Sequence, residues 1–167
     1  RIYRLYRQAD LTVKKRRKAK RPPQERVPLQ VAKNINEVLS MDFVSDSLAN
    51  GRRIKCLTVV DDFSKESVEI AVDYAISGQY VTRVLDQVAR FRGYPLAVRT
   101  DNGPEFTSRA FLAWTHTHGI RHILIEPGKP MQNGYIESFN GKFRDECLNE
   151  HWFVTMDQAR RIIESWR

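Results

Sequence analysis

The order of strand-like and helix-like patterns after Val38 limits this chain to one class of fold. Three strands come first, and a helix, a strand, a helix, a strand and two helices follow. Tight turns between the first three strands indicate an antiparallel meander, whereas helical crossovers to the later strands indicate parallel pairing. The order predicts an α/β fold with a mixed five-stranded sheet, three strands antiparallel and two further strands parallel, and with helices on both faces. The predicted strands are 39–44, 54–60, 67–72, 95–100 and 121–125, and the predicted helices are 78–91, 105–118, 132–144 and 156–166.

Apolar spacing predicts which side of each element faces the core. In the first strand, Leu39, Met41 and Phe43 fall on one face, while Ser40, Asp42 and Val44 fall on the other. Helical spacing of three or four residues selects a buried stripe on each helix. The predicted stripes are Val81, Val84, Leu85, Val88 and Phe91; Phe106, Ala110, Ala113, Trp114 and Thr117; and Ile136, Phe139, Phe143 and Cys147.

The positive charge of the chain is concentrated in its first 26 residues. That segment holds eleven Lys or Arg against two acids, a net charge of +9, while residues 27–167 hold 17 basic and 18 acidic residues, a net charge of −1. The run from Lys14 through Lys15, Arg16 and Arg17 to Lys18 is typical of a nucleic-acid-binding tail, because neutralised phosphates release counterions. A solvated linker is the alternative. We therefore expect a basic helical tail and linker over residues 1–34 and a globular core over 35–167.

The lengths of the apolar runs and the two cysteines indicate where in the cell the protein is expected. No apolar run is long enough to span a membrane. Cys56 and Cys147, without a Cys-x-x-Cys pair, fit core positions in a reducing cytoplasmic compartment. The chain starts at Arg1 and stops within a predicted helix, so we expect a segment of a longer protein, truncated at its C-terminus.

Three acids occupy unusual places in these elements. Asp42 lies inside the first strand, Asp101 ends the fourth, and Glu137 lies in the first turn of a helix. Buried acids repel one another unless they are paired or bind a cation, and Mg²⁺ or Mn²⁺ prefers such oxygen ligands. Two such ions can support phosphodiester chemistry. Plainer readings remain open, namely an exposed Glu137-to-Arg144 helix face and an ordinary turn capped by Asp101.

Other titratable residues have structural explanations. Asp61 and Asp62 lie at a predicted hairpin turn, Asp46 at a turn and Glu105 in a predicted first helical turn, where acids are common. The histidines at 116, 118 and 122 are expected at the surface or at the edge of the core. No Ser or Cys is paired with a His in the pattern of a nucleophile and its base.

Three blocks that carry the acids resemble the integrase catalytic core of bacterial insertion-sequence transposases. The blocks are residues 41–44, 99–106 and 132–141, and 35 residues separate Asp101 from Glu137, the spacing of the Asp-Asp-35-Glu class. The segment 145–153 is also similar to that group. Leu39, where a Trp is usual, and Val44, where a Thr is frequent, depart from the pattern.

The resemblance implies a ribonuclease-H-like fold, metal-dependent DNA 3′-end cleavage and strand transfer during transposition. It implies that Asp42, Asp101 and Glu137 are catalytic metal ligands, with two Mg²⁺ or Mn²⁺ ions when DNA is bound. DNA at the element ends and target is the implied partner, and the active complex is expected to be a homo-oligomer without a membrane. DNA contacts are expected from Lys142 and Arg144, and support from Asn102, Gly103, Asn133 and Asn140. A nuclease of the same fold without strand transfer, or a catalytically silent DNA-binding or assembly module, stays open.

Overall fold

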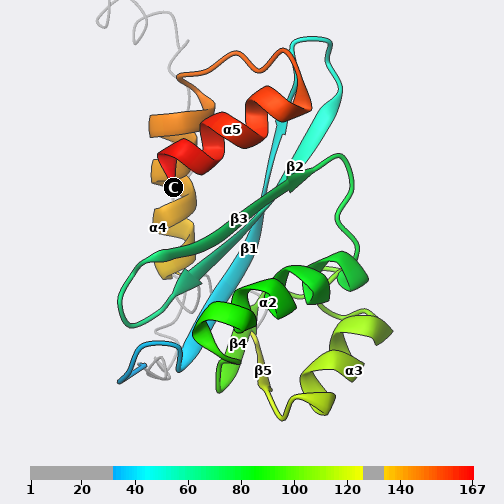
Figure 1. Cartoon of the computed structure of the whole chain (residues 1–167), viewed down its shortest axis with the longest axis vertical. Helices are drawn as coiled ribbons and strands as arrows, with labels where there is room; N and C mark the ends of the chain where they lie inside the picture. The colour runs from blue at the N-terminus through cyan, green and yellow to red at the C-terminus, as the bar shows by residue number, and fades with distance from the viewer. Residues whose placement is uncertain (1–31, 126–133) are drawn as a thin grey trace, which may run out of the picture.

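The computed structural model describes residues 32–125 and 134–167, and it confirms the predicted fold class (Figure 1). Three strands open the fold, and helices and strands then alternate. Their bounds are β1 Val38–Ser47, β2 Arg53–Asp61, β3 Ser67–Asp73, α2 Gly78–Arg92, β4 Ala97–Thr100, α3 Arg109–Thr117, β5 Arg121–Leu124, α4 Gly134–Phe143, the π-helical turn η2 Arg144–Leu148, and α5 Met156–Trp166.

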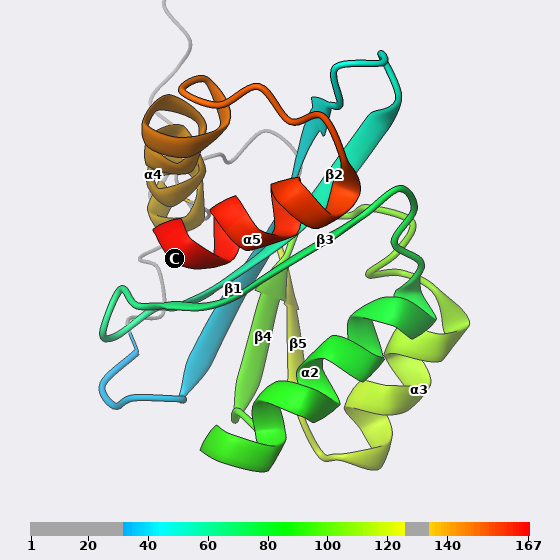
Figure 2. The ribbon, with the colours of Figure 1, turned by 45° about the horizontal axis from the view of Figure 1, so that its top comes forward.

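The sheet has the order β3-β2-β1-β4-β5, which puts β1 at its centre. β1 is antiparallel to β2, with Asp42 opposite Thr58, and parallel to β4, with Ser40 opposite Arg99. β2 and β3 are antiparallel, and β4 and β5 are parallel. Figure 2 shows α2 and α3 on one side of this sheet and α4 and α5 on the other. The meander and the two parallel additions are therefore as predicted.

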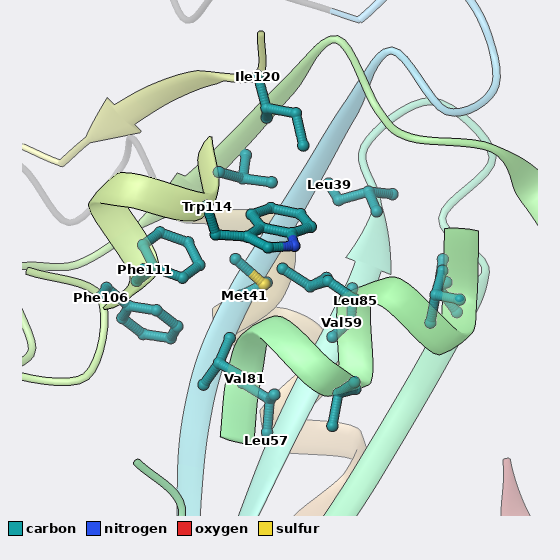
Figure 3. Close-up of a cluster of buried hydrophobic side chains, with 14 of the residues drawn as sticks. Leu39, Met41, Leu57, Val59, Val81, Leu85, Phe106, Phe111, Trp114 and Ile120 are labelled. Atoms are coloured by element: carbon teal, nitrogen blue, oxygen red, sulfur yellow. The ribbon is translucent and has the colours of Figure 1, made fainter. Parts of the chain in front are cut away.

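Each face of the sheet has its own hydrophobic core. On the α2 and α3 side, Leu39 and Met41 of β1 pack with side chains of both helices (Figure 3). On the other side, Val44 of β1 packs in a cluster that includes Phe143 and Cys147. The alternation predicted for β1 is thus confirmed, because successive side chains of a strand point to opposite faces.

Helix α3 begins four residues later than predicted, and this shift changes its buried face. Ser108 caps the helix by accepting a hydrogen bond from the Phe111 amide, while residues before it form a turn. Phe106 is buried as predicted, but it belongs to that turn and cannot set the phase of the helix. The buried helical residues are Phe111, Trp114 and Thr115, so the prediction was wrong for Ala110, Ala113 and Thr117, which are exposed.

Helix α2 follows its prediction except at its last apolar residue. Val81, Val84, Leu85 and Val88 are buried, whereas Phe91 is 91% exposed. A turn of about 100° per residue leaves Phe91 about 80° from Val81, at the edge of the stripe. The helix then ends at Gly93, whose amide bonds to the Ala89 carbonyl.

The predicted helix over 132–144 continues as a wider turn. After α4, the amide of Asn149 bonds to the carbonyl of Arg144, five residues back, and Cys147 and Leu148 of this turn are buried. Cys56 is buried too, as predicted for both cysteines, and burial raises the pKa of its thiol to about 12. Among the described helices, none has the length and apolar character needed to cross a membrane.

Candidate active site

Asp42 lies within β1, and Asp101 directly follows β4, the strand that pairs in parallel with β1. Ser40 of β1 pairs with Arg99 of β4, and the Ser40 hydroxyl and the Arg99 guanidinium both bind the carboxylate of Asp62. Side chains two residues apart on a strand point to the same face. Asp42 therefore shares a face with Ser40, where it contacts Asn140 of α4, and the charge of Asp101, which directly follows β4, acts on Asp42.

Asp42 is half-buried and held by polar contacts from two neighbouring elements. Its Oδ2 accepts a hydrogen bond from Asn140 Nδ2 at 3.0 Å, and its Oδ1 accepts one from the Phe43 amide at 2.7 Å. Thr58 of β2 donates to Asn140 Oδ1 at 2.9 Å and lies 3.1 Å from the Asp42 carbonyl oxygen. The amide of Asn140 thus joins α4 to the two central antiparallel strands at Asp42.

The charges of the other two predicted acids, Asp101 and Glu137, act on Asp42. Burial raises the pKa of the Asp42 carboxyl, and the nearby charges of Asp101 and Glu137 raise it further. Within the described ranges, no three His, Cys, Asp or Glu side chains lie close enough together to hold a metal ion. The three acids therefore share one electrostatic environment without forming a closed set of ligands.

The donor chemistry of this group fits a hard divalent cation. All three side chains offer carboxylate oxygens, which Mg²⁺ and Mn²⁺ prefer over nitrogen or sulfur. A cation would also offset the burial and like-charge repulsion that raise the Asp42 pKa. Asp101 and Glu137 are both exposed, so their oxygens are accessible from solvent.

The turn after β4 presents Asp101. The Gly103 amide donates to Asp101 Oδ1 at 2.9 Å, and Asn102 Nδ2 donates to the Ile125 carbonyl at 3.2 Å. A Cβ at position 103 would lie 3.0 Å from Asp101 Oδ1 and 3.3 Å from Glu105 Oε2, so a side chain there would crowd the turn. Asn102 and Gly103 therefore shape the loop that carries the acid.

Glu105 differs from its prediction as a first-turn helix acid. It lies outside α3 and forms an ion pair with Lys55 of β2. The Lys55 ammonium also lies 3.8 Å from the centre of the Phe43 ring. This contact ties the Asp101 turn to β2, next to the strand of Asp42.

The residues expected to contact DNA are only partly within the described ranges. Lys142 is exposed on α4, and Arg144 is exposed while donating to the Ser45 carbonyl at 2.9 Å. Arg144 therefore fastens η2 to β1 with part of its guanidinium. Asn133 and the run Lys14–Lys18 lie outside the described residues. The supporting role of Asn133 and the DNA contacts of the basic run remain predictions.

The other acids and histidines have structural contacts. Asp61 accepts hydrogen bonds from the amides of Phe63 and Ser64, which confirms its role in the turn. His118 stacks on Tyr94 with ring centres 4.0 Å apart. His122 packs edge-on against Phe111 in the core, and burial lowers the pKa of its imidazole.

Sequence reasoning missed the buried polar group around Asp62. Asp62 was predicted to be a plain turn residue, yet it is 3% exposed and bound by Ser40 and Arg99. The available signal was Arg99 itself, because a charged residue within a buried strand requires a partner. Thr58 was missed as well, since nothing in its sequence context marks its contact with Asn140.

A mixed sheet of order β3-β2-β1-β4-β5 with helices on both faces defines the ribonuclease-H-like class of α/β proteins. Two family models for an integrase core domain match this sequence, one over residues 32–130 and one over residues 118–167. The chain belongs to the integrase core domain family, because one of these models alone covers more than half of it.

Two insertion-element proteins show the relationship. An uncharacterized 39.2 kDa protein of IS476 from Xanthomonas euvesicatoria is 72% identical over 166 residues, which are 99% of this chain and 48% of that protein. An uncharacterized 31.7 kDa protein of IS407 from Burkholderia multivorans is 64% identical over 167 residues, which are 100% of this chain and 60% of that protein. The chain thus spans about half to three fifths of the length of these relatives.

Solved structures share the fold at low sequence identity. A chain of the simian T-cell lymphotropic virus intasome, in complex with PP2A regulatory subunit B56 gamma, aligns with a TM-score of 0.70 and 22% identity over 85% of this chain and 52% of that one. The HTLV-2 integrase catalytic core domain in complex with magnesium, in a dimeric form, aligns with a TM-score of 0.57 and 20% identity over 78% of this chain and 86% of that one.

Proposed function

We propose that this chain is the catalytic core of a transposase that cleaves DNA 3′ ends and transfers the freed strand during movement of an insertion element. The observation that carries the proposal is that Asp42, held by Asn140 of α4, lies near enough to Asp101 and Glu137 for both of their charges to act on it. Membership in the integrase core family supports the reaction class. The magnesium complex of the HTLV-2 core domain supports the choice of metal.

Asp42, Asp101 and Glu137 would hold two Mg²⁺ or Mn²⁺ ions when DNA is present. Ions held there would supply an activated water or 3′-hydroxyl and would stabilise the leaving oxygen. Asn140 and the Phe43 amide each donate a hydrogen bond to one oxygen of Asp42 and so fix its carboxylate. The Gly103 amide fixes one oxygen of Asp101 in the same way.

The remaining parts of the chain fit DNA as the substrate. We place a basic tail and linker at 1–34 and the catalytic core at 35–167, and we assign DNA contacts to Lys14–Lys18, Lys142 and Arg144. The intasome and the dimeric HTLV-2 core support DNA binding and a homo-oligomeric active complex. Such a protein would act on DNA in the bacterial cytoplasm.

Isosteric replacement of the acids tests the chemistry. Asp42→Asn, Asp101→Asn and Glu137→Gln should each abolish Mg²⁺-dependent cleavage and joining of branched or pre-cleaved oligonucleotides, with folding and DNA binding retained. Asp46→Asn is the matched control, because Asp46 lies on β1 four pairs beyond Asp42 and its carboxylate accepts a hydrogen bond from the neighbouring Ser47 amide. Cleavage retained in any of the three acid variants would refute the assignment.

Metal binding and product analysis separate the alternatives. Calorimetric titration with Mg²⁺ or Mn²⁺ in the presence of DNA should show binding that Asp101→Asn removes, and absence of binding would favour a silent assembly module. A pre-cleaved 3′-hydroxyl end should give joined product. Cleavage without joining would favour a simple nuclease.

A further inference from the structure

The turn between β2 and β3 contacts all three elements that carry the proposed catalytic acids. Figures 1 and 2 both show this turn beside the start of α4. Asp62 of the turn reaches β1 and β4 at Ser40 and Arg99, and Lys65 reaches α4 at Tyr135. Ser40, Arg99 and Tyr135 each precede an acid, Asp42, Asp101 or Glu137, by two residues.

The strand side of this connection is buried and charged. Asp62 Oδ1 accepts a hydrogen bond from the Ser40 hydroxyl at 2.6 Å, and Asp62 Oδ2 pairs with the Arg99 guanidinium. Arg99 and Asp62 are 2% and 3% exposed. A buried pair of this kind has little freedom, so the turn is firmly fixed to the two central parallel strands.

The helix side of the connection depends on Lys65. Its ammonium lies 3.0 Å from the centre of the Tyr135 ring and also donates to the Asp62 carbonyl. A cation over an aromatic face is attracted by the negative charge density of the ring. Lys65 therefore joins the turn, and through Asp62 the two strands, to the first turn of α4.

The backbone at Lys65 is unusual for this residue type. Its φ is +63°, in the left-handed region that favours Gly or Asn. A lysine there carries a conformational cost that a glycine would not. The side chain at this position accordingly has a contact to Tyr135 that glycine could not make.

We propose that Lys65 is a positioning residue that sets the location of Glu137 relative to Asp42 and Asp101 by holding the first turn of α4 through Tyr135. Tyr135 and Glu137 lie about 200° apart around the helix. The lysine thus contacts α4 on the side away from Glu137 and does not cover the exposed carboxylate. The inference rests on the proposed function where it concerns activity. The effect on the position of α4 can be measured without activity.

Lys65→Gly is the decisive variant, because it relieves the left-handed backbone while removing the ammonium. We expect a melting temperature equal to or above that of the unchanged chain, yet faster amide hydrogen exchange over 134–143. With a branched DNA substrate at saturating Mg²⁺, kcat should fall about five- to tenfold with KM within twofold. Tyr135→Leu, which leaves the net charge unchanged, should show the same faster exchange and the same lower kcat. The double variant should lower kcat no further than either single variant.

Three conservative variants serve as controls. Lys65→Arg keeps the cation and Tyr135→Phe keeps the ring. Both variants should therefore retain the exchange protection and the kcat of the unchanged chain. Glu66→Gln removes a charge from the same turn, where Glu66 pairs with Arg92, and should change neither. Unaltered exchange and kcat in Lys65→Gly would overturn the inference while leaving the proposed function intact. If the unchanged chain has no activity, the proposed function fails, and the exchange data alone decide for or against the contact.

Discussion

Removing Arg99 should severely destabilise the fold. Arg99 is 2% exposed in the middle of the sheet, and its guanidinium pairs with the equally buried carboxylate of Asp62. In Arg99→Met the aliphatic side chain keeps most of the packing, but Asp62 loses its cationic partner. Burial already raises the pKa of the Asp62 carboxyl, and loss of Arg99 should raise it further.

The expected cost follows from the burial of the pair. Breaking a buried ion pair on one side costs about 3–5 kcal/mol in the free energy of unfolding, because the remaining charge stays uncompensated. For a chain of this size, the melting temperature should fall by about 6–20 °C. Arg160→Met, which breaks the more exposed pair with Asp73, should cost about 1 kcal/mol or less.

Urea unfolding followed by circular dichroism measures these costs. In the double variant Arg99→Met with Asp62→Asn, no buried charge remains and the Asn oxygen can still accept from Ser40, so its cost should be well below the sum of the two single variants. An Arg99→Met cost under about 1 kcal/mol, or strict additivity in the double variant, would refute the view that this buried pair anchors the β2–β3 turn.

Three further outcomes are expected. Asn140→Ala removes the donor to Asp42 and the acceptor for Thr58, so it should lower the free energy of unfolding by about 1–2 kcal/mol and reduce kcat. Asn140→Asp, measured beside it, keeps only the acceptor. Burial lowers the pKa of His122, so the unfolded chain binds a proton that the folded chain does not as pH falls below the ordinary His value of about 6.5. The free energy of unfolding should therefore decrease below that pH. His122→Asn should remove this decrease from a plot of the urea midpoint against pH. Neutralising Lys14–Lys18 should weaken DNA binding equally for all sequences and reduce its salt dependence in filter-binding or anisotropy titrations, whereas an unchanged salt slope would make the segment a linker.

Local sequence patterns were enough to predict the strands and helices and which side chains of β1 face each core. The alternation around Asp42 survives in the structure because a strand has a period of two residues whatever it packs against. The pairing of the strand of Asp42 with the strand that precedes Asp101 was predictable because a helical crossover between strands implies parallel pairing. The spacing from Asp101 to Glu137 indicated the family before any coordinates were considered.

Tertiary contacts decided the features that local patterns do not encode. Ser108 caps α3, which begins at Arg109 and not at Glu105, and the exact start of a helix sets which residues face inward. Asn140 and Thr58 meet at Asp42 only because α4 lies against β1 and β2. The link from Asp62 and Lys65 to the three acid-bearing elements joins residues up to 70 positions apart.

The amino-acid sequence by itself therefore determined the strand and helix order, the sheet class and the three acids, since these follow from short-range periodicity and from motif spacing. Only the folded chain decided how those acids are held. A hydrogen bond or a cation–π contact between distant residues depends on the relative placement of whole elements, and that placement comes from packing both faces of the sheet at once.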